Sequence, residues 1–197
     1  MISIVMANSR ARIPAYGGLD PIFGVNPISF GFPCDPEPVI VDFAVSRMVV
    51  SDIRQAITRG EQLPLGVALD SNGNETTDPK AALDGALLAI DGHKGNALAL
   101  AVELLAGPLV RAKAGTAIKR ARGYLFIVIN PAVFGSISQF KEDVSSLVHE
   151  IKTSRRQPGC QELFFPGEQS ARNRALARKQ GVDVPDEILS VVWALTR

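Results

Sequence analysis

One helix is predicted by the sequence Gly92-His93-Lys94-Gly95-Asn96-Ala97-Leu98-Ala99-Leu100-Ala101-Val102-Glu103-Leu104-Leu105-Ala106-Gly107. Glu103 is the only charge between Lys94 and Arg111. Because a helix that is apolar on all sides has to be enclosed, we expect the rest of the fold to surround it. Glu103 and Gly107-Pro108 interrupt the apolar stretch too early for it to span a bilayer.

His93 and Lys94 stand at the start of this helix. The first N–H groups of a helix have no partners within the helix, and its dipole is positive there, so a phosphate or carboxylate would meet several donors. The flanking Gly92 and Gly95 would let the backbone approach a ligand closely. Two interpretations stay open on this basis: the pair binds a cofactor phosphate, or it is a solvated cap on a core helix.

The composition is that of an ordinary globular protein. The chain has 197 residues, of which 46% are hydrophobic and 21% charged, with a net charge of +1. That charge argues against nucleic acid or an acidic membrane as a partner. Cys34 and Cys160 lack metal-binding or disulfide spacing, which fits a reducing cytoplasm, and Met1–Met6 does not resemble a secretory signal. With His93 and His149 as the only histidines, no metal site is expected.

Local patterns predict the remaining elements. Residues 7–38 hold three clusters of turn residues and are expected to be loop-rich. Strands are expected at 38–43, buried and ending near Asp42, at 124–129 and at 163–165. Helices are expected at 45–59, 80–88, 138–154, 167–180 and from Pro185 to Leu195, and residues 111–122 are expected to form a surface loop.

Few side chains outside the 92–107 segment suggest chemistry. Neither a Gly-x-Gly-x-x-Gly nor a Gly-x-x-x-x-Gly-Lys-Ser/Thr motif is present. Asp42 ends a predicted strand, where carboxylates often meet ligands, but it could equally cap the next helix. Asp52 could orient a catalytic histidine or be an ordinary exposed aspartate. His149 is expected to be structural, and neither cysteine has a base nearby in the sequence.

An ordered series of motifs resembles the type-2 malate/L-lactate dehydrogenase family, which also includes sulfolactate dehydrogenase, ureidoglycolate dehydrogenase, diketogulonate reductase and piperidine-2-carboxylate reductase. The motifs are Asn8-Ser9, Gly17-Gly18, Gly24-Val25-Asn26-Pro27-Ile28, Val41-Asp42-Phe43-Ala44-Val45-Ser46, Leu63-Pro64, Ala68-Leu69-Asp70, Thr76-Thr77-Asp78-Pro79, Gly92-His93-Lys94-Gly95 and Pro166-Gly167-Glu168.

The resemblance implies an NAD- or NADP-dependent oxidoreductase acting on a 2-oxo or 2-hydroxy acid or a cyclic imine. The implied fold is α/β (α+β), a mostly antiparallel sheet flanked by helices and distinct from the Rossmann fold, in a homodimer. The residues matching the family's dinucleotide-binding positions are Val41, Asp42, Phe43, Ala44, Val45, Ser46, His93, Lys94, Pro166, Gly167 and Glu168. Asp52 matches an aspartate that orients a catalytic histidine.

Two departures from the family pattern stand out. Val25 replaces a usual threonine, and Val49-Val50-Ser51 replaces a small Ala-x-Gly turn, which would narrow the site. The resemblance covers about the C-terminal three fifths of a family chain, so residues 1–197 are expected to be one cofactor-binding portion without the family's N-terminal catalytic histidine segment.

Three functional hypotheses follow. The first is a dehydrogenase portion, either truncated or one piece of a split enzyme that associates with a complementing chain. The second is a catalytically inactive remnant that acts only as an association module. An acyl-transfer enzyme using Cys34 or Cys160 is a distant third.

Overall fold

The computed structural model describes residues 1–195, which form two compact units: Met1–Ser145, and the remainder from Ser146. The elements are β1 (Ile2–Ala7), β2 (Ile13–Pro14), β3 (Pro21–Phe23), β4 (Ile28–Phe32), β5 (Val39–Phe43), α1 (Val50–Arg59), β6 (Ala68–Leu69), α2 (Pro79–Asp84), β7 (Ala86–Leu87), α3 (His93–Ala106), β8 (Tyr124–Ile129), α4 (Ile137–Thr153), α5 (Glu168–Gln180) and α6 (Asp186–Leu195), with short 3-10 turns at 108–110, 115–117 and 131–133. That residues 1–197 act as a single portion stays a prediction.

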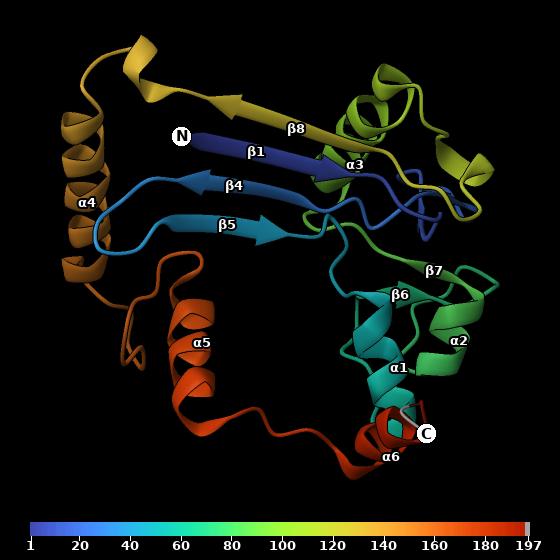
Figure 1. Ribbon diagram of the computed structural model, residues 1–197. Coiled ribbons are helices and arrows are strands. Elements are labelled where there is room, and N and C mark those ends of the chain that lie inside the picture. The colour runs from blue at the N-terminus through green and yellow to red at the C-terminus, as the bar shows by residue number, and fades with distance from the viewer. Residues whose placement is uncertain (196–197) are drawn as a thin grey trace. The chain divides into compact units, whose positions relative to one another are not determined.

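A four-stranded antiparallel sheet forms the first unit's framework, in the order β5-β4-β1-β8 (Figure 1). The expected antiparallel sheet with helices and the strand at 124–129 are confirmed. The expectation that residues 7–38 are loop-rich is confirmed, although β4 lies within this stretch and pairs with both β1 and β5. Strand β4 is only five residues long, so its pattern is hidden among the flanking turn residues.

Helix α3 joins the two apolar cores of the first unit. Val102 and Ala106 pack with Met6 of β1 and Ile28 of β4, while Ala99 belongs to a larger cluster that includes Val45, Ile53 and Leu87. The predicted helix is confirmed, but the expectation that it is enclosed is wrong, since Leu100 and Leu104 on its outer side are 45% and 51% exposed. Although α3 is apolar on all sides, one of its sides is therefore exposed in the first unit.

Two predicted elements around α3 differ from the structure. The strand at 38–43 exists, but it is a sheet edge and not buried, and Asp42 and Phe43 are exposed. The helix expected at 45–59 begins at Val50, because Ser46 is extended and bridges to Ala89. Here long-range pairing outweighs the helical spacing of the apolar residues.

The helix expected at 80–88 ends at Asp84, and the next residues form β7, which pairs with β6. Its N-terminus is as predicted, since the Asp78 side chain accepts a hydrogen bond from the backbone of Lys80 and Pro79 is the first helical residue. Residues 163–165 do not form a strand.

The helices predicted toward the C-terminus are confirmed with small shifts. Helix α4 runs from the first unit into the second, which also contains α5 and α6. Among residues 1–195, none of the helices combines the length and the apolar character needed to cross a membrane.

Candidate functional site

An extended segment of the first unit lies beside the turn that leads into α3. The backbone N–H of Ile90 donates to the carbonyl of Val45 at 2.9 Å, and that of Arg47 donates to Leu88 at 2.9 Å. Ser46 forms an antiparallel bridge with Ala89 between them. The fold therefore brings together two of the three predicted dinucleotide-binding segments, which are almost fifty residues apart in sequence.

The glycines around His93 and Lys94 have a structural explanation. Gly92 has φ 55°, a left-handed conformation that most side chains disfavour. A Cβ on Gly95 would lie 1.8 Å from the carbonyl oxygen of Ile90. Gly95 therefore packs against the chain's own backbone, and our expectation that it admits a ligand is replaced by this internal contact.

His93 and Lys94 are both exposed at the first turn of α3. The Tyr16 ring meets the His93 ring edge-on, with centroids 5.8 Å apart. Lys94 forms an ion pair of 3.4 Å with Asp91, and both side chains are more than 70% exposed. Such a surface pair is weak, so it leaves the Lys94 ammonium able to pair with an incoming anion.

The Ser46 hydroxyl is the one buried polar side-chain atom among the described residues that lacks a hydrogen-bond partner. Ser46 is only 6% exposed. Buried hydroxyls are nearly always bonded, so an orphaned one next to an exposed cationic turn indicates a ligand or water contact. The side chain was predicted as a dinucleotide contact, and its unsatisfied state is compatible with that role.

The other residues of the 41–46 segment differ in what they can offer. Asp42 is exposed and lies opposite Ser29 on β4, while Val41 lies opposite Phe30. The Val45 side chain is fully buried in the core, and its backbone N–H donates to Val25. Val45 thus positions its neighbours, and Asp42, Phe43 and Ala44 remain accessible as predicted contacts.

Asp52 lies in the first turn of α1 and is exposed. Its backbone N–H donates to the carbonyl of Val49, and its carboxylate accepts a long 3.4 Å hydrogen bond from the Ser51 hydroxyl. The imidazole that it would orient is not among the partners it has in the described chain. Its role stays a prediction.

The turn Pro166-Gly167-Glu168 belongs to the second unit and opens α5. The Glu168 carboxylate accepts hydrogen bonds from Lys152 at 2.8 Å and from Arg172 at 2.7 Å. Burial opposes ionisation of Glu168, but the hydrogen bonds from Lys152 and from the backbone of Phe165, together with the positive charges of Lys152 and Arg172, outweigh it and lower the pKa of Glu168. Because this carboxylate is already bonded, contact with a nucleotide would fall to the backbone of the turn.

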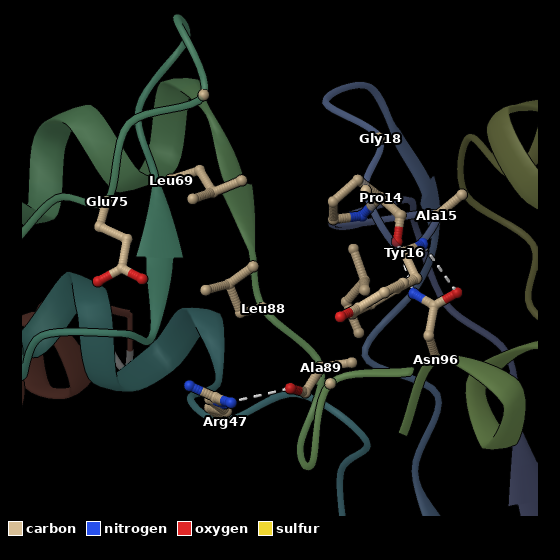
Figure 2. Close-up of a pocket in the computed structure, with 14 residues that line it drawn as sticks. Pro14, Ala15, Tyr16, Gly18, Arg47, Leu69, Glu75, Leu88, Ala89 and Asn96 are labelled. Atoms are coloured by element: carbon tan, nitrogen blue, oxygen red, sulfur yellow. Dashed lines mark hydrogen bonds between the residues drawn. The ribbon is translucent and has the colours of Figure 1, made fainter. Parts of the chain in front are cut away.

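A cavity of about 450 Å³ in the first unit was missed by the sequence analysis (Figure 2). The loop 14–18 forms one wall, and residues near β6 and β7 form another. Its lining includes Ile13, Pro14, Ala15, Tyr16, Gly17, Gly18, Arg47, Leu69, Gly73, Glu75, Leu88, Ala89, Gly92 and Asn96. These residues meet only through strand pairing, so no local pattern could have revealed the cavity. Among the lining residues, Gly17, Gly18, Leu69 and Gly92 belong to motifs quoted for the resemblance.

The cysteines and His149 behave as ordinary side chains. Cys34 is buried with its Sγ 3.2 Å from the hydroxyl of Ser145, and Cys160 approaches the carbonyl of Glu162. His149 is exposed on α4. Within residues 1–195, no three or more His, Cys, Asp or Glu side chains lie together in a way that could hold a metal ion.

Comparison with known proteins gives a consistent family. The family model described as malate/L-lactate dehydrogenase matches residues 1–192. An L-sulfolactate dehydrogenase from Methanothermobacter thermautotrophicus is 34% identical over 100% of this chain and 58% of its own length. A Delta(1)-pyrroline-2-carboxylate reductase from Ancylobacter novellus is 38% identical over 91% of this chain and 54% of its own.

Solved structures agree. Malate dehydrogenase from Entamoeba histolytica superposes with a TM-score of 0.95 at 26% identity, over 99% of this chain and 60% of that one. Sulfolactate dehydrogenase from Methanocaldococcus jannaschii superposes with a TM-score of 0.85 at 35% identity, over 95% of this chain and 56% of that one. The chain belongs to the malate/L-lactate dehydrogenase family. It spans somewhat more than half the length of the relatives it matches.

Proposed function

We propose that this chain is the nucleotide-binding portion of an oxidoreductase that transfers hydride between NADH or NADPH and a small 2-oxo or 2-hydroxy acid or a cyclic imine carboxylate. Family membership supports an oxidoreductase, because the named relatives are dehydrogenases and reductases. The nicotinamide ring would supply the hydride when the cofactor is bound. The residues assigned here bind and orient that cofactor, and they do not include the proton donor.

The observation that carries the proposal is the position of the unsatisfied Ser46 hydroxyl beside the turn that begins α3. Lys94 and His93 would contact a cofactor phosphate together with the first N–H groups of the helix. Ser46 would bond a polar group of the same molecule, which would satisfy its hydroxyl. The accessible residues Asp42–Ala44 lie just before Ser46 in the chain and would contribute further contacts to the cofactor.

The substrate class rests on the names of the relatives. Sulfolactate, malate and pyrroline-2-carboxylate all carry a carboxylate next to a carbon that bears a hydroxyl or an imine nitrogen. Reduction adds hydride to the 2-position carbon of the corresponding 2-oxo acid or of the imine and a proton to its oxygen or nitrogen, and oxidation of the hydroxy acid is the reverse. We therefore propose the shared 2-position chemistry as the reaction, without a choice among the acids or between NADH and NADPH.

Isothermal titration of the folded chain with NADH and NADPH tests the proposal. We expect saturable binding of at least one of them. Lys94→Ala should weaken it about tenfold, since losing a charge-assisted phosphate contact costs on the order of 1.4 kcal/mol. Lys119→Ala, at another exposed lysine, is the matched control and should change little. The absence of saturable binding by a folded sample would rule the proposal out.

A second candidate function is association with another polypeptide. One face of the sheet carries Tyr124, Phe126 and Val128 of β8, which are 52%, 66% and 60% exposed. Contiguous exposed apolar side chains of this kind mark interaction surfaces. Sedimentation should show a mass above that of one chain, and Phe126→Asp should lower it. A monomer at every concentration would exclude self-association, and unchanged nucleotide binding by Phe126→Asp would separate the two functions.

A further inference from the structure

We propose that the first unit holds a binding site for a small zwitterion of the α-amino acid class, in the cavity between the loop 14–18 and the turn 69–75. The cavity uses none of the side chains assigned to the nucleotide. Its volume of about 450 Å³ lies within the range of small-molecule sites. Leu69 and Leu88 supply an apolar wall, toward which Figure 2 shows the Tyr16 ring extending from the opposite loop.

Arg47 gives the cavity a fixed positive charge. Its Nε donates to the carbonyl of Ala89 at 3.2 Å, and its Nη1 donates to the carbonyl of Gly66 at 2.7 Å (Figure 2 draws the first of these). Two carbonyls hold the guanidinium in place without neutralising it. No carboxylate lies within 4.0 Å of it in the described part of the chain. Its remaining N–H groups are available to a ligand carboxylate.

Glu75 gives the same cavity a negative charge that is likewise unpaired over residues 1–195. The turn before it is rigid: the Asp70 carboxylate accepts hydrogen bonds of 2.9 Å from the backbones of Asn72 and Asn74. Glu75 then bridges to Leu69. The Arg47 guanidinium and the backbone that carries Glu75 are therefore held before a ligand arrives, which reduces the ordering cost of binding.

This charge arrangement selects among ligands. A simple carboxylic acid would gain from Arg47 but would be repelled by Glu75, and a simple amine would meet the reverse situation. A molecule with a carboxylate, an ammonium group and an apolar side chain satisfies both charges and the leucine wall. An α-amino acid with an apolar side chain meets this description.

Three probes that share one isobutyl group separate these cases: L-leucine, 4-methylpentanoate without the ammonium group, and 3-methylbutylamine without the carboxylate. In isothermal titration of the full chain, without nucleotide, we expect saturable binding of L-leucine. Each single-charge analogue should bind about tenfold or more weakly, because one charge contact is lost. The proposal is overturned if folded protein shows no saturable binding of L-leucine, or if 4-methylpentanoate binds equally well.

Substitution of Glu75 gives the sharper test. Glu75→Gln should weaken the binding of L-leucine and strengthen that of 4-methylpentanoate, so that the two affinities differ by no more than about threefold. Glu142→Gln, at an exposed glutamate of α4, is the matched control and should keep the wild-type difference. Arg47→Gln should likewise reduce the difference between the affinities for L-leucine and 3-methylbutylamine. The Arg47→Gln variant could fail to fold, because two carbonyls lose their donor. The Glu75→Gln variant tests the site in that case too: the proposal is contradicted if its affinities for L-leucine and 4-methylpentanoate differ as much as those of Glu142→Gln.

Discussion

The side-chain amide of Asn26 donates a 2.7 Å hydrogen bond to the buried carboxylate of Glu103. The backbone N–H of Gly115 donates to the other oxygen at 2.7 Å, and the Asn8 amide approaches it at 3.5 Å. The lone charge of the apolar helix α3 thus ties three loops to the helix. Each partner is a hydrogen-bond donor, so both oxygens of the Glu103 side chain have to be acceptors.

Glu103→Gln is therefore predicted to destabilise the first unit although it keeps the shape of the side chain. The new amide must point its N–H groups at a donor, which leaves a buried group unsatisfied at a cost of about 1–3 kcal/mol. Urea unfolding followed by circular dichroism measures this loss. Glu142→Gln on the exposed side of α4 should have no comparable effect, and equal stability of the two variants would contradict the prediction.

Gly95→Ala is predicted to lower stability against the trend of helix propensity. In an open helix, alanine would be favoured over glycine by about 0.8–1.0 kcal/mol. At Gly95 the new Cβ would lie 1.8 Å from the carbonyl oxygen of Ile90, so the turn before α3 must move. We expect a lower melting temperature and weaker nucleotide binding. An alanine variant as stable as the wild type would show that Ile90 yields easily.

Local signals explain what could be predicted from sequence. Strand β8 and helix α3 combine strong composition with clear ends, and both were located within a residue. Strands β1 and β4 were missed, and the partners of β1 are distant in sequence: Met6 lies opposite both Ile28 and Leu125. Pairing across such separations is a property of the folded chain.

The residues of the candidate site also fall into two groups: those that a local sequence feature revealed and those that only the fold reveals. His93 and Lys94 were found because a helix start is a local feature, whereas the orphaned state of Ser46 depends on its bridge to Ala89. Arg47 and Glu75 carried no sequence signal at all. Their charges become informative only once the fold places them in one cavity without neutralising partners.

Ser46→Ala is predicted to separate folding from binding. Removing a buried hydroxyl that has no partner over the described residues should leave stability unchanged or raise it by up to about 1 kcal/mol. The same change should weaken nucleotide binding about fivefold if the hydroxyl bonds the ligand. Ser9→Ala is the matched control: its hydroxyl accepts a 3.0 Å hydrogen bond from the backbone of Val25, so its loss should cost about 1 kcal/mol. Reduced stability of Ser46→Ala would indicate an internal partner for this hydroxyl.

Acid is predicted to destabilise the second unit through protonation of Glu162. Hydrogen bonds from Arg172 and then Lys152 lower the pKa of Glu162 from 4.5 to about 2. A carboxyl whose pKa is depressed by folding contributes stability above its unfolded value, and this contribution is lost as the pH falls from about 4.5 toward 2. Carboxyl titration by NMR should give a Glu162 midpoint near 2, and Arg172→Met should move it upward. Glu162→Gln should make the unit less stable at pH 6 and also less sensitive to acid between pH 5 and 2. An unchanged Glu162 midpoint in Arg172→Met would mean that the bond to Arg172 does not persist in solution.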